Sequence, residues 1–240
     1  IAGMVGFLVV LVLHLQRHEL GGAPGEDAAG SPETAAESDG LMAGIRMLLQ
    51  APVVLCFTFF MLVAMGQVGM MTLGPATMIA LLETPLAVAN GAVSTLMAGI
   101  MAGIAVGGVI ADRQDRHDLV TGICVTITAG LFLLIPVVEP RTVPSLWLFA
   151  VAGLVYGITG PARDMMVRSV STATTRGKVF GFTYSGLDFG SAVSGVLFGA
   201  ILDAGRPEWV FRLIPLFMMV SIASLLTSQF LVRRLAGKGT

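Results

Sequence analysis

Charged residues are what this sequence has least of. Of its 240 residues only 12% are charged, and 15 acidic residues against 14 basic ones give a formal net charge of -1. Soluble globular domains carry roughly 25% charged residues, so the composition excludes an ordinary soluble domain. The near balance of charge also excludes a basic nucleic-acid-binding protein, and no nucleic-acid partner is expected. The missing charge predicts a chain that lies in lipid.

Cysteine and histidine are scarce as well. The two cysteines, Cys56 and Cys124, both lie in apolar runs, so neither a disulfide framework nor a metal cluster is expected. The three histidines have no second ligand at metal-binding spacing. The sequence also lacks the His-Glu-x-x-His motif, the phosphate-binding loop and the Gly-x-Ser-x-Gly elbow. We therefore expect no enzyme, no metal site and no bound cofactor.

Long uncharged intervals dominate instead, and 55% of the residues are hydrophobic. A membrane-spanning helix needs roughly 20 predominantly apolar residues, and the intervals between charged residues provide six such segments. The apolar runs are continuous rather than alternating, which favours helices over the strands of a membrane barrel. The expected spans cover residues 47–71, 88–111, 119–138, 145–163, 179–202 and 211–232.

These spans predict an all-α membrane protein, a six-transmembrane-helix bundle over residues 45–240. A repeat with three spans re-enters the membrane from the opposite face, so two inverted three-helix repeats are expected. Residues 1–13 are apolar but too short to cross a bilayer, and we interpret them as the end of a truncated transmembrane helix. Residues 14–44 include an acidic run rich in Gly, Ala, Ser and Pro, which is typical of a flexible linker.

The placement of Lys and Arg sets the expected orientation, because cytoplasmic loops carry an excess of both. One side receives the linker, the C-terminus and the connections near 112–118 and 163–178, and it holds eleven of the 14 basic residues. The other side holds Arg141, Arg206 and Arg212. The linker and the C-terminus are therefore predicted to be cytoplasmic.

Small residues recur at intervals of four along two of the spans, where they allow helix backbones to approach closely. The expected packing positions are Gly99, Gly103, Gly107, Gly186, Gly190, Gly195 and Gly199. Two interpretations are open: a static contact between helices, or a surface that slides between two packed arrangements.

One connection carries a more specific pattern, which reads Gly-Gly-Val-Ile-Ala-Asp-Arg-Gln-Asp-Arg-His from Gly107 onward. One interpretation is that its arginines, Arg113 and Arg116, only mark this connection as cytoplasmic. The run also resembles the pattern Gly-x-Leu-Ala-Asp-Arg-x-Gly-Arg-Arg between helices eight and nine of the major facilitator superfamily. Matches fall at Gly108, Ala111, Asp112, Arg113 and Arg116, whereas Ile110, Asp115 and His117 depart from the pattern.

A second segment resembles the eleventh helix of the same family. It runs from Arg176 to Gly181 and leads into Gly190, Gly195, Gly199 and Asp203. The resemblance implies the C-terminal half of a transporter, from the end of helix six to helix twelve, with the first, second, fourth and fifth spans lining a substrate cavity. The implied partners are an N-terminal six-helix half, a small-molecule substrate and the lipid bilayer. The implied location is the inner (plasma) membrane of a bacterium.

Polar residues inside or near the spans are the candidates for a site. Asp188 interrupts the fifth span, and a carboxylate there is costly unless it faces a cavity or a partner. It either couples transport to protons or binds substrate, or it hydrogen-bonds or ion-pairs between helices; both interpretations are open. Gln67 and Asn90 are likewise candidates for substrate binding or for tying helices together.

Adjacent charges end the fourth span, at Arg163 and Asp164. Together with Asp112, Arg113 and Arg116 they are candidates for a cytoplasmic gate; alternatively they mark the end of a helix in water. The expected function is secondary active transport of a small solute by alternating access, coupled to an ion such as the proton. A non-transporting scaffold, a channel or a polytopic membrane enzyme has the same hydropathy and stays open as an alternative.

Overall fold

The computed structural model describes residues 48–114, 116–138, 146–169, 171 and 175–236. The segments expected as a truncated helix at 1–13 and as a linker at 14–44 lie outside the described residues. The described helices are α3 (Ala51–Leu82), α4 (Leu86–Arg113), α5 (His117–Val138), α6 (Trp147–Ser169), α7 (Arg176–Asp203) and α8 (Glu208–Ala236).

The prediction of an all-α bundle is confirmed, because each of the six expected spans is a helix. Five of these described helices are long and apolar enough to cross a membrane. The sixth, α6, is less apolar because its last two turns carry Arg163, Asp164 and Arg168. The hydropathy of the sequence therefore located all six described helices, and α6 is more polar than the other five.

Most of the helices run further than their apolar spans predicted. α3 continues to Leu82 through Pro75, and it ends where Glu83 takes a left-handed φ of 52°. α6 continues to Ser169, and α7 already begins at Arg176. The predicted end of α3 was too early because the span was given only the roughly 20–25 residues that a bilayer requires, although the uncharged interval runs to Leu82. At α6 and α7 the predicted bounds stopped at charged residues, whereas the backbone hydrogen bonds of a helix continue into water.

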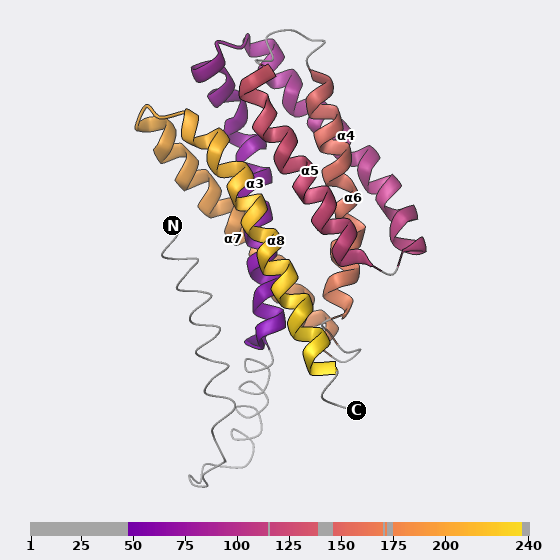
Figure 1. The fold of residues 1–240 in the computed structure, drawn as a ribbon. Coiled ribbons are helices and arrows are strands. Elements are labelled where there is room, and N and C mark those ends of the chain that lie inside the picture. Colours follow the sequence, from indigo (N-terminus) through magenta and orange to yellow (C-terminus); the bar gives the residue numbers. More distant parts are fainter. Residues whose placement is uncertain (1–47, 115, 139–145, 170, 172–174, 237–240) are drawn as a thin grey trace, which may run out of the picture.

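Successive helices run in opposite directions, so α3 begins and α8 ends at the same end of the bundle (Figure 1). α4 packs along α6, α3 packs along both α7 and α8, and α5 contacts α6 and α8. The first three helices can be matched in order with the last three: α3 with α6, α4 with α7 and α5 with α8. Under this match the contact between α4 and α6 corresponds to the contact between α7 and α3, and the contact between α5 and α6 corresponds to the contact between α8 and α3. Two inverted three-helix repeats produce this pairing.

Glycine allows α4 and α6 to come into backbone contact. A Cβ atom added at Gly103 would press on the carbonyl oxygen of Leu154 and lie 2.9 Å from the Cα of Gly157. Real Cβ atoms essentially never come within 3.0 Å of another heavy atom. Gly99 and Gly107 meet the α6 backbone in the same way. These three positions hold α4 against α6 at a distance that a side chain would not allow.

The glycines of α7 fall into two groups. A Cβ atom at Gly186 would lie 2.7 Å from the carbonyl oxygen of Phe57, and a Cβ atom at Gly190 would come still closer to the carbonyl oxygen of Met61 on α3. At Gly195 and Gly199 an added Cβ would meet nothing within 4 Å. The close contact expected at these two positions is therefore not made by the described helices.

Candidate functional site

Polar side chains inside the bundle gather between α6 and α3. Tyr156 and Arg163 are seven residues apart on α6, which is about two helical turns, so they project from the same face. Gln67 lies near the middle of α3. The ring of Tyr156 is buried, with only 4% of the residue exposed. The three residues thus come from two helices that are far apart in the sequence.

Two hydrogen bonds join these residues into a polar network. The Tyr156 hydroxyl donates to Gln67 Oε1 at 2.7 Å, and it accepts from Arg163 Nη1 at 3.2 Å. The amide nitrogen of Gln67 reaches the sulfur of Met71 at 3.4 Å, which is a weak acceptor. The structure therefore links a residue predicted to bind substrate, Gln67, with one predicted to form a gate, Arg163.

Two aromatic rings hold the guanidinium of Arg163. Its Cζ lies 5.6 Å from the ring centroid of Phe60 and 5.4 Å from that of Tyr156, both within the range of a cation–π contact. Its Nε is buried and has no hydrogen-bond partner among the described residues. The two rings fix the position of the guanidinium, and most of its N–H groups make no hydrogen bond to a described residue.

The side chain of Arg163 extends into the bundle. Long side chains in a helix lean toward its N-terminus, and the bond to Tyr156 takes the guanidinium in that direction. Arg163 lies six residues before the end of α6 at Ser169, which is about 9 Å along the axis. An arginine this close to a helix end usually snorkels toward water. Specific contacts hold this one in the interior instead.

The neighbouring charge, Asp164, bonds to a different helix. Its carboxylate accepts a hydrogen bond from the hydroxyl of Tyr184 on α7. The ring of Tyr184 in turn packs 5.3 Å from the ring of Phe60 on α3. α6 therefore directs a positive charge toward α3 and a negative charge toward α7, and Phe60 contacts both Arg163 and Tyr184.

Two of the predicted substrate candidates lie outside this network. Asp188 is exposed one turn beyond Tyr184 on α7. Asn90 is exposed in the second turn of α4. Among the described residues, no side chain bonds to the side chain of either one. Of the three predicted candidates, the structure joins only Gln67 to the network.

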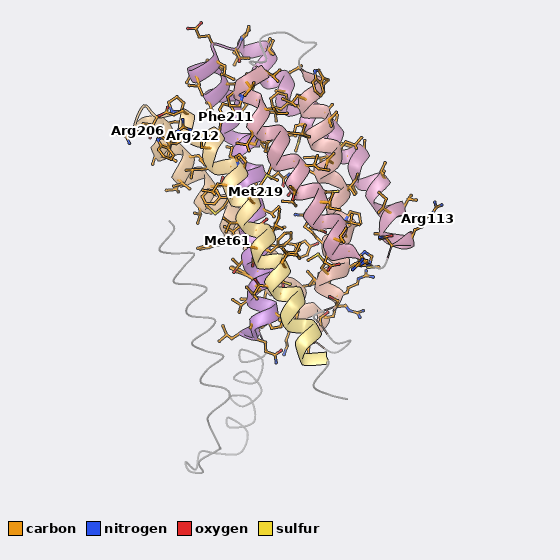
Figure 2. All side chains as sticks on the ribbon, viewed as in Figure 1. Met61, Arg113, Arg206, Phe211, Arg212 and Met219 are labelled. Atoms are coloured by element: carbon orange, nitrogen blue, oxygen red, sulfur yellow. The ribbon has the colours of Figure 1, made fainter. Side chains whose placement is uncertain are left out.

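The loop candidates for a gate lie at the α4–α5 connection. Asp112 and Arg113 end α4, Arg116 follows, and all three are exposed. Figure 2 shows Arg113 at the tip of α4, far from Arg206 and Arg212 near the α7–α8 connection. Within the described part of the chain, no hydrogen bond or ion pair connects these loop residues to the charges of α6. The two groups of gate candidates are therefore separate in this conformation.

Neither tyrosine was predicted as a site residue, although a signal was present. The chain has only two tyrosines against 13 phenylalanines, and each tyrosine hydroxyl bonds to one of the adjacent α6 charges. A tyrosine hydroxyl inside an apolar span needs a hydrogen-bond partner. The spacing of seven between Tyr156 and Arg163 therefore pointed to a partner on the same helix.

The described residues contain no group of three or more His, Cys, Asp or Glu side chains that could hold a metal ion. The polar network consists of an amide, a phenol and a guanidinium, and the separate Asp164–Tyr184 pair adds one carboxylate and one phenol. Hydrogen bonding is the chemistry that these groups share.

Comparison with known proteins assigns most of this chain to one family model. The model, described as the Major Facilitator Superfamily, matches residues 92–238. This match covers more than half of the 240 residues, and it includes both tyrosines and the two α6 charges. A comparison with curated proteins finds no match.

Proposed function

The chain belongs to the major facilitator superfamily, and on this premise we propose that it forms the C-terminal half of a secondary transporter. Membership of the family implies an integral membrane protein that takes part in transmembrane transport. The proposed activity is the movement of a small solute by alternating access, coupled to protons. In that activity the described helices rock against an N-terminal six-helix half.

The order of motifs along the helices supports the assignment to the C-terminal half. The pattern of the eighth-to-ninth connection, with Asp112 and Arg113, lies where α4 ends. The pattern of the eleventh helix coincides with the start of α7 at Arg176. On this count α3, α4, α6 and α7 are helices seven, eight, ten and eleven, which line the substrate cavity in the family. The polar network joins two of these four helices.

The observation that carries the transport proposal is the network of Gln67, Tyr156 and Arg163. Ionisable side chains within membrane segments are costly, and they usually mark the path of a solute or an ion. Here a charge is drawn into an apolar bundle by a tyrosine and two rings. A bond that served only to hold α3 against α6 would not need a charged group with unused donors.

Asp188 is the proposed coupling residue. It lies twelve residues after the start of the 28-residue helix α7, and no described side chain neutralises it. A carboxylate at such a depth favours the neutral form when it is shielded from water and the charged form when it is hydrated. We propose that Asp188 takes up a proton in one orientation of the transporter and releases it in the other.

The test uses the protein that carries this chain, reconstituted in proteoliposomes with a pH-sensitive dye inside. Solutes are added one at a time, and a transported solute is expected to change the internal pH. Counterflow of the labelled solute distinguishes a carrier from a channel. Asp188→Asn is expected to abolish the solute-driven proton flux, because the amide cannot carry the proton.

Asp203→Asn is the matched control, since Asp203 is an exposed carboxylate at the end of the same helix. Its proton flux should equal that of the unmodified protein. Unchanged flux in Asp188→Asn would contradict the coupling role. Failure of every solute class to show either uptake or counterflow would contradict the transport proposal itself.

A further inference from the structure

The polar network has N–H donors with unused capacity at both ends. The Tyr156 hydroxyl is satisfied on both sides, because it donates to Gln67 and accepts from Arg163. At one end, the amide nitrogen of Gln67 reaches only the thioether of Met71. At the other end is the guanidinium. A solute that reaches either end of the network therefore meets N–H groups, of Gln67 at one end and of Arg163 at the other.

The unused capacity is greatest at Arg163. A guanidinium has five N–H donors, and only the bond to Tyr156 is made to a described residue. Its Nε is buried without a partner. A buried charged donor that lacks an acceptor costs free energy. The geometry therefore calls for an acceptor, preferably an anionic one, next to the guanidinium.

No described carboxylate supplies this acceptor. Asp164 bonds to Tyr184 on α7, and Asp188 is exposed farther along α7. The other acidic residues of the described part of the chain lie at or near helix ends, and they are Glu83, Asp112, Asp118, Asp203 and Glu208. Arg163 is thus a cation inside the bundle without a described counter-ion.

We propose that this site binds the carboxylate group of a small organic monoanion, and that monocarboxylates are the substrate class of the transporter. The planar fork of Arg163 matches the two oxygens of a carboxylate. The amide of Gln67 supplies a second donor, and the buried rings of Phe60 and Tyr156 hold the guanidinium in place. This inference rests on the proposed transport function.

The number of positive charges limits the solute to one negative charge. Arg163 is the one cation among the described residues that bonds within the network. A phosphate monoester or a dicarboxylate would bring an uncompensated charge into the bundle, which is costly inside a membrane. The site therefore favours a singly charged carboxylate over more highly charged anions.

The experiment compares carboxylates with neutral amides of nearly the same shape. The purified protein is heated with benzoate or benzamide, and with phenylacetate or phenylacetamide. The carboxylates are expected to raise the unfolding temperature and the amides are not. Equilibrium dialysis with labelled benzoate or phenylacetate then gives the dissociation constant for each variant.

Arg163→Gln is expected to weaken carboxylate binding about 10- to 100-fold, the range for loss of a charged hydrogen bond. Gln67→Leu should weaken it less, and it tests the site independently if Arg163→Gln does not fold. Arg168→Gln is the matched control, because Arg168 is exposed on the same helix. Its dissociation constant should not change.

Equal stabilisation by carboxylates and amides would overturn the inference, and so would unchanged carboxylate binding in Arg163→Gln. Failure here is distinct from failure of the transport proposal. A protein that moves neutral or cationic solutes in proteoliposomes without preferring carboxylates is a transporter of another substrate class. If carboxylates bind in an Arg163-dependent way but no solute is taken up, the carboxylate-binding site is supported and the transport proposal is contradicted.

Discussion

Replacing Gly103 with alanine tests how closely α4 and α6 pack. The new Cβ would meet the carbonyl oxygen of Leu154 and lie 2.9 Å from the Cα of Gly157. Both contacts are with backbone atoms, so no side-chain rotation can relieve them. The two helices must therefore move apart along the face that also holds Gly99 and Gly107.

Two opposing terms decide the magnitude. Alanine is more favourable than glycine in a helix by about 1 kcal/mol, whereas forcing extra atoms into a packed interior costs about 1–3 kcal/mol. The cost at Gly103 belongs at the upper end, because backbone cannot yield as a flexible side chain does. We expect a net loss of about 1–2 kcal/mol in the free energy of unfolding. For a chain of this size that lowers Tm by about 2–8 °C.

Gly108→Ala is the matched control on the same helix. An added Cβ there would meet nothing within 4 Å, so only the gain in helix propensity remains and Tm should be equal or higher. Unfolding in detergent can be followed with a thiol-reactive dye, because Cys56 is buried and Cys124 is half-buried. A Gly103→Ala protein as stable as the Gly108→Ala protein would refute the close backbone approach.

Two further predictions concern the network and the topology. Tyr156→Phe removes the hydroxyl between Gln67 and Arg163 and should destabilise the protein by about 1–3 kcal/mol, measured as a lower Tm in the same assay; an unchanged Tm would show that the bridge contributes nothing. Single cysteines placed at Arg113 and at Glu83, in a background without the native cysteines, should label from opposite faces of the membrane with an impermeant thiol reagent. Labelling of both from the same face contradicts the predicted topology.

Much of the fold was predictable because crossing a membrane is a local property of the chain. A span must be long, apolar and internally hydrogen-bonded, and uncharged intervals report on this directly. The packing face of α4 was predictable for a similar reason, since Gly99, Gly103 and Gly107 repeat with the period of a helix. The same period at Gly195 and Gly199 predicted close helix packing, but no described helix packs against these two positions. Periodicity identifies a face of small residues and does not say which helix lies opposite.

The site was less predictable, for a reason visible in its residues. Gln67, Arg163 and Asp164 were each singled out as polar residues in or near apolar spans. The two tyrosines were not, because a tyrosine in an apolar span needs a hydrogen-bond partner but the sequence does not say which helix supplies it.

Hydropathy and the spacing of charges were enough to establish a helical membrane protein and the order of its spans, because both depend on neighbours along the chain. The contact between Tyr156 and Gln67 joins residues 89 positions apart. Such a contact exists only once the fold brings the face of α6 that carries Tyr156 to the middle of α3. The direction of Arg163, inward to a tyrosine rather than outward to water, was decided in the same way by the rings and hydroxyl that packing brings around it.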